Sequence, residues 1–171
     1  QAGRDALRIA DELGDAGLHT AAALGEALVR LNAGDPAARS DLLAAHDAGL
    51  RLRLDELATV PMSHLAHHEV EQGRFAQADD ILGEALRFTE EREIPICHMW
   101  QRGVQARLRL FQGRWAEAEQ IALAVLESGD IPMGRSIPAI TSYVVTKLEG
   151  QVFDAQGAPY DYLDVVEVTS V

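Results

Sequence analysis

Histidines gather at one place in the sequence, the stretch His64-Leu65-Ala66-His67-His68. On a helix, His64 and His68 share a face, and this spacing can offer two imidazoles to one metal ion. A closed site needs further ligands, which only Cys97 or His98 of the following helix pair could supply. The alternative, a partly solvated histidine cluster, requires nothing more. We favour it and predict no metal and no cofactor.

Ser63 and His67 lie four residues apart, the spacing at which a serine and a histidine meet on a helix. A hydrolase also needs a nucleophile held in a strained turn and backbone donors for an oxyanion. The sequence contains no Gly-x-Ser-x-Gly turn. A metal-binding or hydrolytic site at Ser63, His64, His67 and His68 is therefore the least favoured interpretation, and we predict that the chain is not an enzyme.

The elements that position these residues are predicted to be helices, because apolar residues recur at helical spacing and glycine, proline and polar clusters interrupt them. The sequence predicts an all-α fold of about seven helices in antiparallel pairs over residues 1–157, then an irregular or extended tail over residues 158–171. The expected helical segments are Arg4 to Leu13, Gly17 to Leu31, Ala37 to Leu52, Asp55 or Thr59 to Gln72, Phe75 to Glu91, Ile94 to Gln112, Trp115 to Glu127 and Arg135 to Ala155.

One phrase occurs twice, first as Gly73-Arg74-Phe75-Ala76-Gln77-Ala78-Asp79 and again as Gly113-Arg114-Trp115-Ala116-Glu117-Ala118-Glu119. Its glycine can take the left-handed conformation that ends a helix, and its aromatic residue is expected to fill the wedge between paired helices. Its second alanine is small where the helices cross. Gly34 marks a degenerate earlier copy, and Gly157 repeats the turn position. Such a period indicates stacked helix pairs.

These offsets of glycine, aromatic residue and alanine resemble those of tetratricopeptide repeats, over about 140 of the 171 residues. The resemblance implies a right-handed superhelix, an α-solenoid whose first helices line a concave surface. The sequence departs from that family in its longer period, about 39 to 44 residues against about 34 in the family. It also departs at Met62 and Arg102, which stand where a tryptophan is expected.

The run from Gln105 to Glu119, followed by Pro132 and Arg135, is similar to the repeat region of the large ATP-binding LuxR-type transcriptional regulators, the maltose-regulator-like group. That resemblance implies a sensor and interaction arm of a bacterial regulator, between an ATPase module and a helix-turn-helix. The chain has no Gly-Lys pair and hence no phosphate-binding loop of that type. The arm alone is expected to hydrolyse nothing and to bind no DNA.

The repeat register places eight residues on the inner face of the first helices of two neighbouring pairs. Among them, Trp100 and Arg107 are of the types that anchor partners at interfaces. The alternative is that Trp100 packs between repeats and Arg107 pairs with a nearby acid. The predicted partner-binding concave face consists of Val60, Ser63, His67, Val70, Trp100, Gly103, Arg107 and Leu110.

The composition restricts the partners. The net charge is -12, from 27 acidic and 15 basic residues, which disfavours a diffuse attraction to nucleic acid or to an anionic membrane. Cys97 is the only cysteine, so no intramolecular disulfide forms, which fits a reducing cytoplasm. No run approaches the ~20 apolar residues of a membrane span. We therefore expect a cytoplasmic protein.

The function that the sequence favours is a non-enzymatic protein-interaction or effector-sensing domain of a bacterial transcriptional regulator. Its partner would be a protein segment or a small effector held in the concave groove. The alternative is a stand-alone structural or oligomerisation scaffold that self-associates through its terminal helices, which repeat proteins leave without a neighbour on one side.

Overall fold

The computed structural model describes residues 2–127 of the chain, and these residues are helical throughout apart from short turns. No strand occurs among them, so the expected all-α class is confirmed for this part of the chain. The seven helices that it contains are α1 (Ala2–Leu13), α2 (Ala16–Asn32), α3 (Ala38–Leu52), α4 (Asp55–Glu71), α5 (Phe75–Glu91), α6 (Pro95–Phe111) and α7 (Trp115–Glu127).

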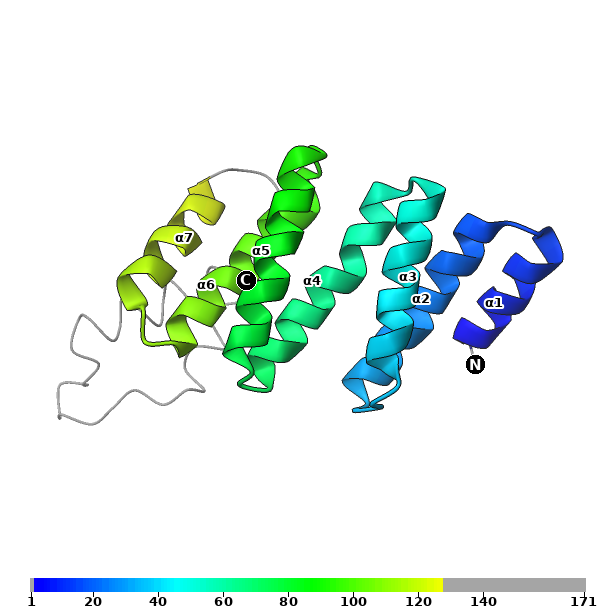
Figure 1. Cartoon of the computed structure of the whole chain (residues 1–171), viewed down its shortest axis with the longest axis horizontal. Coiled ribbons are helices and arrows are strands. Elements are labelled where there is room, and N and C mark those ends of the chain that lie inside the picture. Colours follow the sequence, from blue (N-terminus) through cyan, green and yellow to red (C-terminus); the bar gives the residue numbers. More distant parts are fainter. Residues whose placement is uncertain (1, 128–171) are drawn as a thin grey trace, which may run out of the picture. The chain divides into compact units, whose positions relative to one another are not determined.

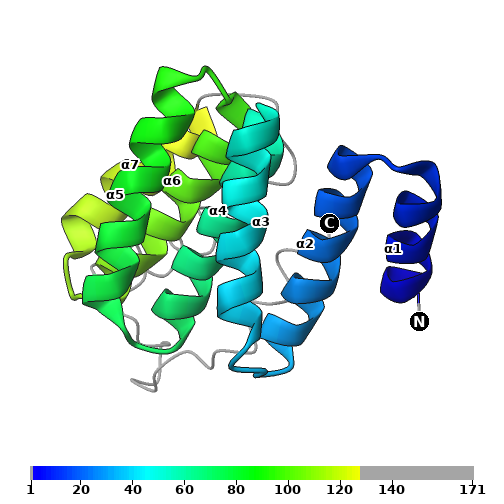
Figure 2. The same ribbon diagram turned by 45° about the vertical axis from the view of Figure 1, so that its right-hand side comes forward.

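The chain divides into two compact units, Gln1–His98 and Met99–Val171. In the first unit, α1 to α5 follow one another in chain order, and each packs against the next (Figure 1). Figure 2 shows the same succession from another side. Helix α2 also contacts α4. Adjacent helices are thus packed as expected for a helical repeat.

Three turns, those of α2–α3, α4–α5 and α6–α7, are closed in the same way. Each has a glycine at positive φ, with values of 79° at Gly34, 71° at Gly73 and 74° at Gly113. The amide after each glycine donates to the carbonyl five residues earlier, at 3.0, 2.9 and 2.9 Å. This is the bond that closes a Schellman motif. The expected left-handed glycines are therefore confirmed at these three turns.

The other three turns, those of α1–α2, α3–α4 and α5–α6, contain the same bond. Their left-handed residues are Gly14, Arg53 and Glu93, with φ of 63°, 57° and 55°. The following amide again donates five residues back, at 3.2, 2.9 and 2.9 Å. These three residues recur at nearly the same interval as the glycines of the first set. Both sets of turns therefore follow the same period, including the α3–α4 and α5–α6 turns, in which the left-handed residue is not a glycine.

The second helices α3, α5 and α7 bury the same register positions in each repeat. In the first unit, α3 packs these side chains against Leu24, Ala27 and Leu31 of α2 and against Leu65 of α4. Small alanines at recurring positions let the helices approach closely. The buried positions are Ala38, Leu42 and Ala45 in α3, Ala78, Leu82 and Ala85 in α5, and Ala118, Ala122 and Val125 in α7.

One expectation about a single residue was wrong. Trp115 does not fill a wedge between helices: it begins α7 and is 43% exposed, and Ala118 one turn later is the residue that is buried. Of the two expected starts of α4, the structure has Asp55, so the helix contains Pro61 in its second turn. Pro61 is buried there, and packing offsets the hydrogen bond that the ring cannot donate.

Other predictions lie outside the described residues. These are the helix from Arg135 to Ala155, the turn at Gly157 and the tail over residues 158–171. Asp35 lies in the turn before α3, where its carboxylate accepts a hydrogen bond from the amide of Ala37 at 2.9 Å. Helix α3 itself begins one residue later, at Ala38.

Candidate functional site

Helix α4 carries four of the predicted partner-binding residues, and the structure separates them by burial. Val60 and His67 are half-buried, and Nε2 of His67 lies 3.7 Å from a carboxylate oxygen of Glu71. Ser63 and Val70 are buried, with 5% and 1% of their surface exposed. The Ser63 hydroxyl donates to the carbonyl of Thr59 at 3.0 Å. Direct contact with a partner stays a prediction for Val60 and His67.

The register explains why the other two α4 positions are inside. One repeat earlier, Leu24 of α2 occupies the position of Ser63, and Leu31 occupies the position of Val70. Leu24 and Leu31 both belong to the hydrophobic core. Ser63 and Val70 therefore occupy core positions of the repeat, and the sequence prediction that they line an accessible surface needs this correction.

Helix α6 carries the other four predicted residues. Trp100, Arg107 and Leu110 are half-buried, whereas Gly103 is buried. The guanidinium carbon of Arg107 lies 5.2 Å from the centre of the Phe111 ring, within the range of a cation–π contact. Arg107 is thus held over an aromatic side chain one turn later.

The histidine cluster on α4 has no metal geometry. Within the described part of the chain, no group of three or more histidine, cysteine, aspartate or glutamate side chains is arranged to hold a metal ion. Burial, and then the neighbouring His67, lower the pKa of His64. Burial also raises the pKa of the Cys97 thiol, as does the charge of Glu56. His98 is engaged elsewhere, with Nδ1 at 3.0 Å from the Thr89 hydroxyl.

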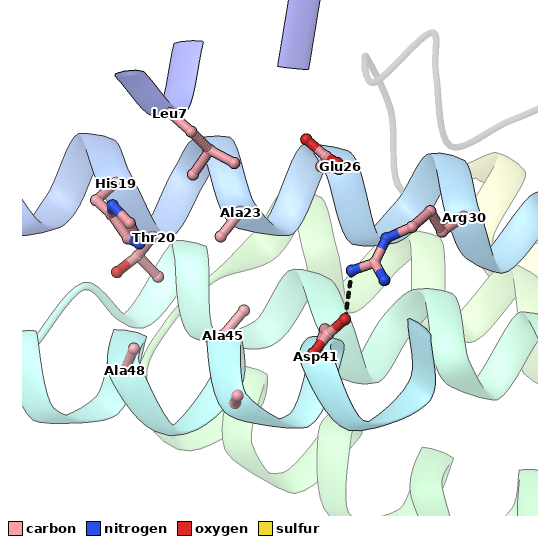
Figure 3. Close-up of a pocket in the computed structure, with 10 residues that line it drawn as sticks. Leu7, His19, Thr20, Ala23, Glu26, Arg30, Asp41, Ala45 and Ala48 are labelled. Carbon is pink, nitrogen blue, oxygen red and sulfur yellow. Dashed lines mark hydrogen bonds and ion pairs between the residues drawn. The ribbon is translucent and has the colours of Figure 1, made fainter. Parts of the chain in front are cut away.

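A groove that the sequence prediction missed runs along α2 between α1 and α3. It has a volume of 340 Å³ and lies wholly in the first unit. Figure 3 shows Leu7 reaching into it from α1, and Ala45 and Ala48 facing it from α3. One helix stripe supplies most of its length, at positions i, i+4, i+7 and i+11 of α2. This stripe consists of His19, Ala23, Glu26 and Arg30.

One end of this groove is charged. Arg30 donates to Asp41 of α3, as the dashed line in Figure 3 marks, and to Asp35 at 3.3 Å. The hydrogen bond to Asp41 is the main reason why the pKa of Arg30 is raised. Two buried atoms of the residues that line this groove have no hydrogen-bond partner, Nε of Arg30 and Oε2 of Glu26. This end of the groove therefore holds one donor and one acceptor that the protein leaves unsatisfied.

A second polar centre lies between α3 and α4. Glu69 of α4 is buried and accepts hydrogen bonds from Arg39 of α3 and from Arg74 in the turn after α4. These residues line a cavity of 330 Å³ together with His68. Burial alone would raise the pKa of Glu69, but the bonds and charges of the two arginines outweigh it and hold this pKa below its ordinary value of 4.5.

The signal for the missed groove is visible in α2 once the helix is known. Glu26 is its only acidic residue and Arg30 its only arginine, and they lie four positions apart in an otherwise alanine- and leucine-rich helix. The contributions of Leu7 and Asp41 come from two other helices. Sequence spacing within one helix does not indicate such tertiary neighbours.

Comparison with known proteins adds no further identification: no family model, no curated protein and no solved structure matches this sequence. Within the described residues, none of the helices combines the length and the apolar character that a membrane crossing requires.

Proposed function

We propose that this chain is a non-enzymatic interaction and effector-sensing domain of a bacterial transcriptional regulator. The observation that carries the proposal is the repeated helix pair, whose two kinds of turn recur at a nearly constant interval with the same closing bond. Repeats of this kind contact only their neighbours, so ligand binding can change their stacking. The regulator assignment rests on the resemblance to tetratricopeptide repeats and to the arm of LuxR-type regulators.

The proposed contact residues are the half-buried members of the predicted face. On α4 these are Val60 and His67, and on α6 they are Trp100, Arg107 and Leu110. Aromatic and arginine side chains that are partly buried before binding lose little conformational freedom when a partner covers them. Trp100 and Arg107 are therefore the expected anchors for a protein segment.

A selection from a random-peptide library on the purified protein tests this assignment. Enriched peptides should bind the wild type and lose at least tenfold in affinity for the variant Trp100→Ala/Arg107→Glu. Trp115→Ala is the matched control, because Trp115 is exposed on another helix. Equal binding to all three proteins, with the double variant folded by circular dichroism, would refute the assignment.

The regulator context is tested by the coding sequence on either side of this segment. A phosphate-binding loop upstream and a helix-turn-helix downstream support the proposal. A reading frame without them favours the scaffold alternative. The non-enzymatic assignment is tested by assaying model esters and peptides, and turnover that Ser63→Ala abolishes would overturn it.

One observation favours the alternative, a scaffold that self-associates. Helix α1 has few buried side chains: among those described, only Ala10 is buried, whereas Ile9 and Leu13 are 47% and 66% exposed. Ile9 and Leu13 lie four residues apart on one face of α1, and contiguous exposed apolar residues are typical of association surfaces. Analytical ultracentrifugation distinguishes the two, since the scaffold requires a dimer that Leu13→Glu disrupts, and the interaction domain does not.

A further inference from the structure

The groove between α1 and α3 contains two buried polar atoms without partners. A buried donor or acceptor that lacks a hydrogen bond destabilises the folded protein. Here the donor is Nε of Arg30 and the acceptor is Oε2 of Glu26; both residues line the groove, and both atoms are shielded from solvent. The remaining lining is mostly apolar, with Leu7 and four alanines. Glu26 and Arg30 lie four residues apart on α2, so their side chains can meet at one site. A ligand that satisfies both atoms needs a donor and an acceptor on a small apolar body.

The charges nearby specify which groups those are. Both terminal nitrogens of Arg30 are already engaged by Asp35 and Asp41, so its charge is balanced, and a neutral carbonyl suits its remaining Nε. Oε2 of Glu26 receives no hydrogen bond from a basic group, and the protein as a whole is strongly acidic, with a net charge of -12. An ammonium group is the donor that such a carboxylate favours.

We propose that this groove binds an α-amino amide, as found in an amino-acid amide or at the amino terminus of a peptide. Its ammonium group would bind Glu26, its carbonyl would accept from Arg30, and its apolar side chain would lie against Leu7 and the alanines. The volume of 340 Å³ is at the lower end of the usual range for small-ligand pockets, about 300–1,000 Å³. The proposal deepens the effector-sensing function proposed above and rests on it.

Binding would also involve α1. Oε2 of Glu26 is shielded from solvent. It faces Gly3 of α1, where an added side-chain carbon would lie 3.2 Å from this oxygen. A ligand therefore reaches Glu26 only when this side chain turns or α1 moves. Helix α1 has Ala10 as the only buried residue among its described side chains, so it is the helix least held in place.

Titration by two-dimensional amide NMR tests the proposal, with leucinamide as the probe at up to about 10 mM, a range suited to weak ligands. Expected are saturable shifts in α1, α2 and α3 for the wild type, and at least tenfold weaker binding to Glu26→Gln. N-acetyl-leucinamide lacks the ammonium group, and isoamylamine lacks the carbonyl. Both should bind at least tenfold more weakly than leucinamide to the wild type.

Matched variants separate a lost contact from a lost fold. Arg30→Lys keeps the charge beside Asp41 but removes Nε, so it should equalise the affinities for leucinamide and isoamylamine. Ala48→Leu fills the groove without changing charge and should abolish binding. Glu12→Gln is the control, since Glu12 pairs with Arg8 on the exposed surface, and it should bind as the wild type does.

Two further arms identify the source of the ligand. If leucyl-alaninamide binds more tightly than leucinamide, the ligand is a peptide amino terminus. If the two affinities are equal, the ligand is a free amino-acid amide. No shifts in the wild type, shifts outside α1 to α3, or unchanged binding to Glu26→Gln and Ala48→Leu would each overturn the proposal. Peptides selected on the Trp100 and Arg107 face would still bind in that case, so its failure is distinguishable from failure of the proposed function.

Discussion

Glu69 is the one charged side chain that is buried among the described residues, and its surroundings show how this protein accommodates a charge in its interior. Arg39 and Arg74 bind it from two sides and keep their own outer surfaces half-exposed. In the preceding repeat, Arg30 and Asp35 occupy the positions of Glu69 and Arg74, with the signs exchanged. An ion pair that spans the turn is thus a feature of the first two repeats, whichever residue carries which charge.

We predict that Glu69→Gln lowers the free energy of unfolding by about 2 kcal/mol at neutral pH. The amide keeps one acceptor oxygen but loses the negative charge and presents an NH2 donor to the second arginine. Urea denaturation followed by circular dichroism measures this. The exposed carboxylate of Glu12 provides the control, and Glu12→Gln should change stability by less than about 0.5 kcal/mol. Equal effects of the two substitutions would contradict the structural role of Glu69.

The pH dependence of that difference follows from the lowered pKa of Glu69. The carboxylate is favoured in the folded state, so its contribution is complete above the ordinary value of 4.5 and is lost as pH falls through the lower folded pKa. The stability difference between wild type and Glu69→Gln should therefore shrink as the pH is lowered below 4.5. A difference that stays constant or grows in acid would contradict this assignment.

At the scale of the helices, turns and crossings set the geometry. The turn after α3 requires a left-handed residue, and the turn after α5 does too, yet the sequence supplies Arg53 and Glu93 there. The crossing of α3 and α4 is close enough that a side-chain carbon at Gly49 would lie 2.9 Å from the backbone of Ala58. These two turns thus hold a residue with a side chain, whereas the helix crossing has no room for a side-chain carbon at Gly49.

Gly49→Ala is expected to destabilise the protein by about 1–3 kcal/mol, because the new carbon meets backbone that cannot move aside. Gly83→Ala is the matched control. It lies within α5 with no atom within 4 Å of the added carbon, so it should stabilise by about 0.5–1 kcal/mol. Thermal unfolding of both variants measures the contrast, and a stabilised Gly49→Ala would exclude the close crossing.

Arg53→Gly should raise the free energy of unfolding by up to about 1 kcal/mol. A left-handed backbone costs a non-glycine residue about 1–2 kcal/mol. Glycine avoids this cost, but it loses more conformational entropy on folding, which offsets part of the gain. Arg51→Gly, in the last turn of α3, should instead cost up to about 1 kcal/mol. Chemical denaturation compares them. A destabilised Arg53→Gly would mean that its side chain matters more than its backbone.

The sequence was sufficient for most helix boundaries and insufficient for the groove. Phe75–Glu91 and Trp115–Glu127 were predicted to the residue, because a glycine turn precedes each helix and the apolar period continues to its end. The start of α4 was left open between Asp55 and Thr59, because both residue types can begin a helix. The groove depends on Leu7 and Asp41 meeting α2 from separate helices, which is tertiary information that no local period contains.

At the scale of the whole molecule, burial is uneven along the first unit. Helix α4 has eight buried residues, and they lie on several of its faces, because α3 and α5 both cover it. Helix α1 has Ala10 as its one buried residue among the described side chains. In an array whose members contact only their neighbours, stability should therefore rise from the end toward the interior.

Native-state amide hydrogen exchange should follow this order within the first unit. Amides of α1 should exchange by local opening at the lowest free energy, and those of α4 at the highest. NMR-detected exchange measures both helices in one sample. Equal protection of α1 and α4 would show that the unit opens as a whole, which would contradict stepwise stability.

The most direct test of the central claim, that the chain binds partners through its first helices, is a hydrogen-exchange footprint of a selected peptide on the wild-type protein. We expect slower exchange in α4 and α6, centred on the helical turns that contain His67, Trp100 and Arg107, and no such change in the Trp100→Ala/Arg107→Glu variant. Protection that avoids both helices, or that persists in the variant, would contradict it.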